Sequence, residues 1–417
     1  HVADVAHMNQ VEATIAENDS FPALAVPLKN GYQVVWVCKN LLEAVHRLAG
    51  GSWSDNPAQC SGESRWNIYS GPRHPEVSDI SAQRIQFTEE PDRILLILPT
   101  WVGDVVMATP FIHALFNRFP QAEITLLMNR HLYSLLEGSP WVSRCVFWPP
   151  RKKTPAAKQQ HKALIAALKA QNFDLAVMLP NSLRSAWLSF RSGARRRVGF
   201  NRDGRGLLLT DRIPVPNRAD GGYEPMPLCD YYAVLADALG MDHPGDGLQL
   251  FLTEADSNAV EQRLLAEGVK PEQPLVVLCP GANFGASKCW APERFAAVAD
   301  RLVTQYNAAV VISPGPGEEP LAEAIGDHMS QASCLLTAPC LTLGELKSLI
   351  ADADLLLGND TGPRHFGRAF DTPRVTVFGP TEQKWTDTSH GSETIVKVEV
   401  PCGPCHKKVC PLEEQVC

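Results

Sequence analysis

From residue 93 onward, short apolar runs alternate with longer segments in which apolar residues recur every three or four positions. Apolar runs lie at 94–98, 123–128, 145–149, 174–180 and 196–200. Short continuous runs of this kind are typical of strands buried on both faces, and the segments between them predict helices, such as one at 156–172. Strands that alternate with helices predict a parallel sheet covered on both sides.

The alternation fades around 217–227 and then starts again. Two predicted helices, at 228–240 and 254–269, precede a second set of apolar runs at 274–282, 308–315, 334–339, 354–360 and 374–380. We therefore expect an α/β protein with two facing doubly wound domains, at 91–245 and 270–400, joined by a linker and helix at 246–269. Ligands of such sheets lie at the carboxyl ends of the strands, so the cleft between the domains is the expected site.

Residues 1–90 form an extension in which only a strand at 32–38 and a helix at 41–50 are predicted, followed by a linker-like stretch at 51–83. We assign no chemistry to it. The chain has 417 residues, 45% hydrophobic and 20% charged, as is typical of soluble globular proteins. No apolar run is long enough for a membrane span, and no basic-then-apolar leader is visible, so we expect a cytoplasmic protein.

Charge is distributed unevenly along the chain. The net charge is −8, but the segment 151–205, called the basic segment below, has thirteen Lys or Arg residues and two acids, Asp174 and Asp203. Such a segment indicates either an ordinary solvated face or a surface for an anionic partner, such as nucleic acid, lipid headgroups or an acidic sugar.

Three strand ends carry polar residues that would point into the cleft. The first is the turn W-V-G-D, which places Gly103 and Asp104 at the start of a helix. A carboxylate there suits a general base that takes a proton from a bound hydroxyl. Asp is also a common helix N-cap, and the turn taken alone favours the cap.

The second strand end is the segment C-P-G-A-N-F-G-A-S-K, which ends at Lys288 just before a helix opened by Ala291 and Pro292. Glycines let backbone N–H groups approach a phosphate, and the lysine adds positive charge. The spacing of a P-loop is absent. An ordinary loop with an exposed lysine is an equally supported interpretation.

In the third segment, N-D-T-G-P-R-H, an apolar run ends at Asp360, a helix begins at Thr361, Gly362 and Pro363, and His365 lies on its first turn. The free N–H groups of that turn and the helix dipole favour an anion, although capping by Asp360 or Thr361 competes with this interpretation. Two anion sites in one domain and a base in the other predict a glycosyltransferase that uses a nucleotide diphosphate sugar.

Five segments carry a resemblance to a known family. In order they are L-P-T-W-V-G-D-V-V-M-A-T-P, L-P-N-S-L-R-S-A, C-P-G-A-N-F-G-A-S-K-C-W, N-D-T-G-P-R-H-F and V-F-G-P-T-E-Q-K-W-T. They resemble the ADP-heptose:lipopolysaccharide heptosyltransferases (glycosyltransferase family nine), above all the second heptosyltransferase of the inner core, over residues 91–417. The resemblance implies a GT-B fold with two facing Rossmann-like domains. It also implies inverting transfer of heptose from ADP-heptose to a lipid A-linked inner-core sugar, without a catalytic metal.

The resemblance also implies roles for single residues. Asp104 corresponds to the general base and Lys288 to the lysine at the donor diphosphate. The implied donor-binding residues are Gly103, Glu318, Asp360, Thr361, Gly362 and His365, with Glu319 as a rival of Glu318 at the adenosine ribose. On the acceptor side we expect Asn181 in the cleft, beside Ser182, and Arg195, Arg196, Arg197 and Arg202 around an anionic, lipid-linked sugar. Peripheral contact with the inner membrane surface would accompany such an acceptor.

The last residues, 401–417, contain Cys402, Cys405, Cys410 and Cys417. A C-x-x-C pair followed closely by two more cysteines predicts a metal knuckle, and four thiolates suit a structural zinc or iron. Free thiols and, less favoured in a reducing compartment, disulfides are the alternatives. This cysteine finger is far from the proposed base in sequence, so we expect it to be structural.

Two other functions remain open at this stage. A GT-B glycosyltransferase that uses another nucleotide sugar and a protein or glycan acceptor would carry the same features. A non-enzymatic nucleic-acid-binding module with a metal knuckle would explain the basic segment and the cysteines. The acidic net charge and the lack of interleaved aromatics suited to base stacking argue against nucleic acid.

Overall fold

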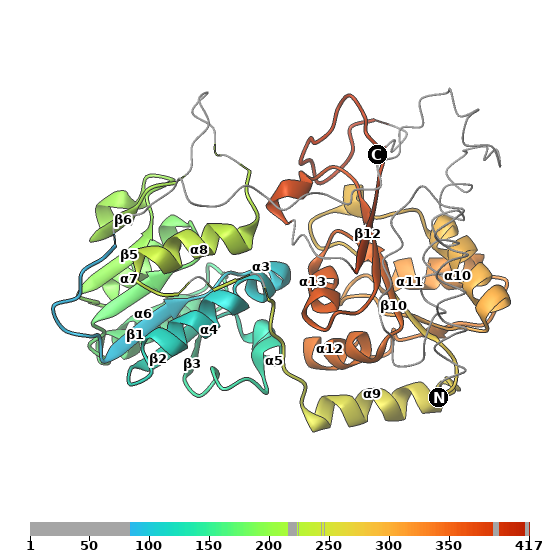
Figure 1. The fold of residues 1–417 in the computed structure, drawn as a ribbon, viewed down its shortest axis with the longest axis horizontal. Coiled ribbons are helices and arrows are strands. Elements are labelled where there is room, and N and C mark those ends of the chain that lie inside the picture. Colours follow the sequence, from blue (N-terminus) through green and yellow to red (C-terminus); the bar gives the residue numbers. More distant parts are fainter. Residues whose placement is uncertain are drawn as a thin grey trace, which may run out of the picture.

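The computed structural model describes residues 84–215, 223, 225–242, 244–245, 247–386, 392–412 and 417. The strand expected at 32–38, the helix expected at 41–50 and the linker at 51–83 lie outside these residues. The described chain forms two α/β domains, one drawn from blue to green and the other from orange to red in Figure 1. The expected fold class, two doubly wound domains facing each other, is confirmed.

The first domain has a six-stranded, all-parallel sheet in the order β3-β2-β1-β4-β5-β6. Its strands are β1 (Arg93–Ile97), β2 (Glu123–Met128), β3 (Cys145–Phe147), β4 (Leu175–Met178), β5 (Arg196–Phe200) and β6 (Asp211–Ile213). The helices are α3 (Val102–Met107), α4 (Thr109–Arg118), α5 (Tyr133–Leu136), α6 (Pro155–Lys169), α7 (Leu183–Arg191) and α8 (Leu228–Ala238), with 3₁₀ turns η2 (Arg130–Leu132) and η3 (Arg205–Leu208).

The second sheet has the order β12-β11-β10-β7-β8-β9, which repeats the first topology, and α9 (Glu254–Ala266) connects the domains. Its strands are β7 (Leu275–Cys279), β8 (Ala309–Ile312), β9 (Cys334–Leu335), β10 (Leu355–Asn359), β11 (Arg374–Phe378) and β12 (Glu393–Lys397). The helices are α10 (Pro292–Tyr306), α11 (Glu319–His328), α12 (Leu343–Asp352) and α13 (Gly362–Ala369), with 3₁₀ turns η4 (Ala286–Lys288) and η5 (Gln383–Trp385).

The central strands explain why the apolar runs predicted the sheets so well. In β1 every residue after Arg93 is buried, and β4 and β10 are buried throughout, because helices cover both faces of each sheet. The edge strands β6 and β12 were not predicted from the sequence. Each is only partly buried, so neither shows a continuous apolar run.

The strand order reverses between β1 and β4 in one sheet and between β7 and β10 in the other. Leu96 lies beside Val177 across the first of these junctions, and Leu357 lies beside Leu278 across the second. A crevice opens at the carboxyl ends of the strands where the order of a doubly wound sheet reverses. The segments that carry Asp104 and Asn181 follow β1 and β4, and those that carry Lys288 and Asp360 follow β7 and β10.

Two contacts join the domains. At the first, α3 packs on α13, and Figure 1 shows α3 reaching from its own domain toward the second one. At the second, α5 packs on α12, where the buried Lys347 donates hydrogen bonds to three backbone carbonyl groups. Its Nζ lies 3.1 Å from the oxygens of Leu135 and Glu137 and 2.7 Å from the oxygen of Phe251. One ammonium group therefore ties α12 to the end of α5 and to the interdomain linker.

Candidate active site

Asp104 lies on the first turn of α3, whose N-cap is Trp101. No side chain makes a capping hydrogen bond at this helix, so the competing interpretation of Asp104 as a cap is not supported. Asp104 is partly exposed, but protein atoms enclose its carboxylate enough that burial raises its pKa to about 6, against the opposing charge of Lys288. An acid with a pKa near 6 is ionised at neutral pH and remains basic enough to take a proton.

Gly103 brings the Asp104 turn into contact with the second domain. A Cβ atom on Gly103 would lie 2.9 Å from Cδ2 of His365 and 3.7 Å from Cα of Gly362, both on α13. Conversely, a Cβ atom on Gly362 would lie 2.7 Å from the Val102 side chain. The two glycines therefore let the N-terminal turns of α3 and α13 meet almost backbone to backbone.

Lys288 lies at the end of η4, on the side of the candidate site that the second domain contributes. Its Nζ donates to Oδ2 of Asp360 at 2.6 Å and to the Asp360 carbonyl oxygen at 2.8 Å. Burial alone would raise the pKa of Asp360, but Arg364 and Lys288 together hold it below its ordinary value. Asp360 thus stays ionised and fixes Lys288. As a buried anion it is unsuited to contact a phosphate directly, although the sequence pattern placed it among the donor-binding residues.

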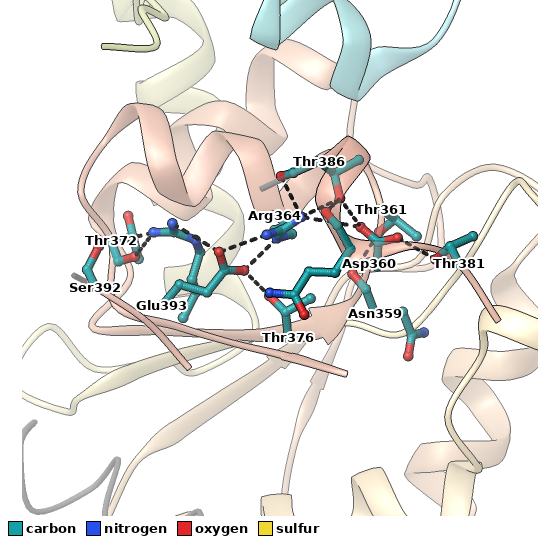
Figure 2. Close-up of polar contacts among 12 residues, drawn as sticks. Asn359, Asp360, Thr361, Arg364, Thr372, Thr376, Thr381, Thr386, Ser392 and Glu393 are labelled. Atoms are coloured by element: carbon teal, nitrogen blue, oxygen red, sulfur yellow. Dashed lines mark hydrogen bonds and ion pairs between the residues drawn. The ribbon is translucent and has the colours of Figure 1, made fainter. Parts of the chain in front are cut away.

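A row of buried charges continues behind Asp360, and Figure 2 shows it running through Arg364 to Glu393. Arg364 lies 3.4 Å from Oδ1 of Asp360 and makes a double contact with Glu393, at 2.5 and 3.0 Å. Thr381 donates to Asp360 at 2.9 Å, and Thr376 donates to Glu393 at 2.6 Å. Because every charge has an opposite partner, the row holds the N-terminus of α13 rigidly in place.

The turn that opens α13 has no side-chain cap among the described residues. Its N-cap Thr361 makes no side-chain cap bond, and the Thr361 hydroxyl instead donates to the Asn359 carbonyl at 3.3 Å. The capping alternative is therefore not supported here either. Asn359 joins the ends of β10 and β7, because its amide donates to Pro280 at 2.5 Å and accepts from the Trp290 N–H at 3.1 Å.

His365 lies against Gly103 and is buried. Burial, with the nearby charge of Arg364, lowers the pKa of His365 to about 3, so the ring is neutral. Its Nδ1 has no hydrogen-bond partner among the described residues. His365 therefore contributes to the contact between the domains, and as a neutral ring it brings no positive charge to a phosphate. Its expected place among the donor-binding residues, as an N–H donor, stays a prediction.

The carboxylates of Glu318 and Glu319 have different partners. The Glu318 carboxylate accepts from the Gly315 N–H at 2.9 Å and lies over the loop after β7, where a Cβ atom on Gly281 would collide with it. Glu319 instead accepts from the Cys340 thiol at 3.4 Å. Of the two, only Glu318 lies beside the loop that leads to Lys288.

The comparisons with known proteins decide the family. The model of glycosyltransferase family 9 (heptosyltransferase) matches residues 161–416. This chain belongs to that family. The enzyme is 28% identical to lipooligosaccharide heptosyltransferase 2 of Haemophilus ducreyi, over 73% of this chain and 88% of the relative. It is also 28% identical to lipopolysaccharide heptosyltransferase 2 of Escherichia coli, over 73% and 87%.

Solved structures agree on the fold of this family 9 glycosyltransferase. A glycosyl transferase family 9 structure from Veillonella parvula superposes with a TM-score of 0.65 at 20% identity, covering 73% of this chain and 86% of the other. The ADP-heptose LPS heptosyltransferase II of E. coli superposes with a TM-score of 0.62 at 24% identity, covering 75% and 92%. Both neighbours support the GT-B arrangement of two facing domains.

On the first domain's side of the enzyme, Asn181 follows β4 and is held on both sides. It accepts from Arg205 at 2.9 Å and donates to the Tyr231 hydroxyl at 3.0 Å. Arg205 is fully buried and also donates to the Phe200 carbonyl at 2.9 Å. In the sequence Arg205 stands out only as part of the basic segment, and its one further signal is its place between Gly204 and Gly206.

The four predicted acceptor arginines have different surroundings. Arg196 pairs with Asp211, and Arg197 donates to the Leu208 and Ala194 carbonyls, at 2.8 Å each. These two therefore fasten the edge of the sheet. Arg195 is well exposed beside Asp174, and Arg202 pairs with Asp203 at 3.3 Å. A role in acceptor binding stays a prediction for all four.

The cysteine finger packs directly on the turn that carries Lys288. The Ser287 hydroxyl donates to the Lys407 carbonyl at 2.5 Å, and the Ser287 N–H donates to the Lys408 carbonyl at 3.2 Å. A Cβ atom on Gly285 would collide with the Lys408 backbone. The finger, remote from the active site in sequence, thus supports the donor side of the cleft.

The expected metal site is not supported by this structure. Among the described residues, no three or more His, Cys, Asp or Glu side chains are arranged to hold a metal ion, and Cys402, Cys405, Cys410 and Cys417 are free thiols. The four cysteines lie near one another. Burial, together with the nearby Cys410, Cys405 and Cys402, therefore raises the pKa of Cys417. Among the described residues, backbone and hydroxyl contacts with η4 hold this finger.

A separate finding concerns the membrane. Within the part of the chain that the structure describes, no helix is both long and apolar enough to span a bilayer.

Proposed function

We propose that this enzyme transfers heptose from ADP-heptose to a sugar of the lipopolysaccharide inner core, with inversion at the anomeric carbon, on the cytoplasmic side of the inner membrane. The names of the two heptosyltransferase relatives support heptose as the sugar and a lipopolysaccharide-type acceptor. One observation carries the proposal. Asp104, a carboxyl group with a raised pKa, lies across the domain contact from Lys288 and the start of α13, whose charge and helix dipole suit an anion.

Asp104 is the proposed general base. It accepts the proton of the acceptor hydroxyl while that oxygen attacks the anomeric carbon from the face opposite the diphosphate. Enclosure of the carboxylate raises its pKa and so strengthens it as a base, and the charge of Lys288 keeps it ionised near neutral pH. A single displacement of this kind inverts the anomeric carbon. It needs no protein nucleophile and forms no covalent intermediate with the enzyme.

Lys288 and the N-terminal turn of α13 are proposed to hold the leaving diphosphate. Two of the three ammonium N–H groups of Lys288 are used by Asp360, which leaves the third for a phosphate oxygen. The backbone N–H groups at Gly362 and the adjoining Thr361 would bind the same anion with the help of the helix dipole. Negative charge grows on the diphosphate as the bond breaks, so these donors act most strongly in the transition state. Glu318 is proposed to bind the adenosine ribose.

The acceptor is proposed to lie against the first domain, beside Asn181. Arg195 and Arg202 are suited to its anionic groups, while Arg196 and Arg197 position the surrounding backbone. The role of Arg202 is supported by its place over the Tyr223 ring, 3.7 Å from the ring centre, which orients the guanidinium.

A donor screen tests the proposal. Purified enzyme is incubated with a heptose-deficient lipopolysaccharide acceptor and ADP-heptose, ADP-glucose or UDP-glucose, and the products are measured by mass spectrometry. We expect a mass increase of one heptose with ADP-heptose only, and an inverted anomeric configuration by NMR. Transfer of a different sugar, or binding of UDP in preference to ADP, would overturn the assignment of the donor.

A further inference from the structure

The outer face of α7 is apolar although it is exposed. Leu183 is 57% exposed, Trp187 43% and Phe190 51%, while the opposite face of the helix, including Ala186 and Leu188, is buried in the domain. The three exposed side chains are spaced by four and three residues, so they form one stripe along the helix. Single exposed apolar residues are common, but a contiguous stripe is a sign of an interaction surface.

The 3₁₀ turn η3, which packs beside α7, extends the stripe with a fourth side chain. Leu207 is 89% exposed, the highest value among the large apolar residues with a described exposure. Arg197 lies between the two elements, because its guanidinium is 5.5 Å from the Phe190 ring centre and donates to the Leu208 carbonyl. We call Leu183, Trp187, Phe190 and Leu207 the α7 face.

Positive charge surrounds the α7 face. Arg191 is exposed, and its guanidinium lies 5.4 Å from the Trp187 ring centre. The neighbouring α6 exposes Lys158, Lys162 and Lys169, and Arg151, Lys152 and Lys153 are exposed just before it. The two acids of the basic segment are already occupied, Asp174 by backbone N–H groups and Arg195, and Asp203 by Arg202. The excess of positive charge is therefore available to a partner.

We propose that the α7 face docks this enzyme on an anionic phospholipid bilayer. Trp and Phe favour the headgroup level of a membrane, and leucines supply apolar area below it. Each Lys or Arg near an anionic surface adds roughly 1 kcal/mol, so the basic surround complements the apolar stripe. A protein partner of ordinary composition offers no reason for so one-sided a charge, and a nucleic acid gains nothing from the two leucines.

The α7 face also lies at a useful place. Ser182 caps α7, and Asn181 immediately precedes it at the carboxyl end of β4, next to the strand that leads to Asp104. Docking through α7 would bring the acceptor side of the cleft to the membrane surface. This role in presenting a lipid-linked acceptor rests on the proposed function, whereas bilayer binding itself does not.

Vesicle sedimentation tests the docking. The full chain is mixed with vesicles of phosphatidylcholine, or of phosphatidylcholine and phosphatidylglycerol in equal parts, at increasing salt. We expect binding to the anionic vesicles that falls with salt. Trp187→Ser/Phe190→Ser should weaken it at least about tenfold, because two exposed apolar side chains that would enter the bilayer are lost. Leu265→Ser, at a side chain 52% exposed on α9, is the matched control and should bind as the wild type does.

Several results would overturn the proposal. Three of them are equal vesicle binding by the double variant and the wild type, no preference for anionic vesicles, and salt-sensitive binding of single-stranded RNA in place of vesicles. Dimerisation of the wild type that the double variant abolishes would assign the face to a second copy instead. Transfer to a deacylated, soluble acceptor is measured in parallel. If the wild type does not transfer heptose to the soluble acceptor, the proposed function is contradicted. If the wild type transfers heptose but does not bind vesicles, only the docking is contradicted.

Discussion

Lys288 and Asp104 belong to different domains, yet the charge of Lys288 opposes the rise in pKa that burial imposes on Asp104. The cation proposed to hold the donor diphosphate thus also favours the ionised form of the proposed base. A residue of the second domain therefore affects the pKa of the proposed base in the first domain. The pH dependence of turnover measures this interaction.

The pH profile of the wild type gives the first prediction. Since Asp104 must be deprotonated to act, kcat/KM should rise with pH and level off above an apparent pKa near 6. Asp104→Asn should lower turnover by about 10²–10⁴ and remove this limb, while ADP affinity, measured by calorimetry, changes little. Turnover of the variant within about threefold of the wild type would contradict the role of Asp104.

Asp104 should also affect stability, with a sign that can be derived. Its pKa is higher in the folded chain than its ordinary 3.8, so the folded state binds the proton more tightly, and stability falls as pH rises from about 4 to about 6. Asp104→Asn removes this penalty. The variant should be more stable than the wild type at pH 8, by up to about 2–3 kcal/mol, with the difference vanishing near pH 4. Denaturant unfolding at both pH values measures it.

Lys288→Ala should have two separable effects. ADP binding should weaken roughly 10- to 150-fold, because a charge-assisted hydrogen bond worth about 1.5–3 kcal/mol is lost. The apparent pKa of the turnover limb should also move upward, since Lys288 no longer favours the Asp104 anion. Lys288→Gln, which keeps most of the length without the charge, should shift the limb in the same direction. An unchanged limb in both variants would show that the two residues do not interact.

Gly103→Ala tests the contact between the domains. The added methyl group would lie 2.9 Å from the His365 ring, so α3 and α13 must separate. We expect turnover to fall at least about tenfold, because Asp104 moves away from the start of α13 and the proposed reacting groups lose their alignment. Gly247→Ala is the control, because a Cβ atom there meets nothing within 4 Å. Equal losses in both variants would point to a general folding defect instead.

The finger makes a prediction of its own. Ser287→Ala removes the bond from η4 to Lys407 and should weaken ADP binding by about fivefold, in line with one hydrogen bond of about 1 kcal/mol. Thr304→Ala is matched to it, because within the described structure the Thr304 hydroxyl bonds only to carbonyls of its own helix. A variant that loses thermal stability while its ADP affinity matches the wild type would show that the finger supports the fold alone.

The sequence predicted the sheets because buried parallel strands are continuous apolar runs. It also predicted that Asp104, Lys288 and Asp360 follow strand ends, because strand ends and helix starts carry their polar residues together. It could not predict Glu393. That residue is separated from Arg364 along the chain, and only the pairing of β11 with β12 brings the two together. It also could not show that Asp360 faces Lys288 rather than a phosphate, or that His365 is neutral, since both follow from burial.

Lys347 has a mechanical consequence. All three of its hydrogen bonds radiate from one nitrogen atom to carbonyl groups of Leu135, Glu137 and Phe251. Hydrogen bonds that share one nitrogen atom oppose sliding of α12 along α5 but allow the two helices to rotate about that atom. We expect the domains to pivot about this point, so that spin labels placed on α3 and α13 separate and approach with donor binding, while a pair on α5 and α12 keeps its spacing. Lys347→Met, which retains the length but no donor, should broaden the second distance as well.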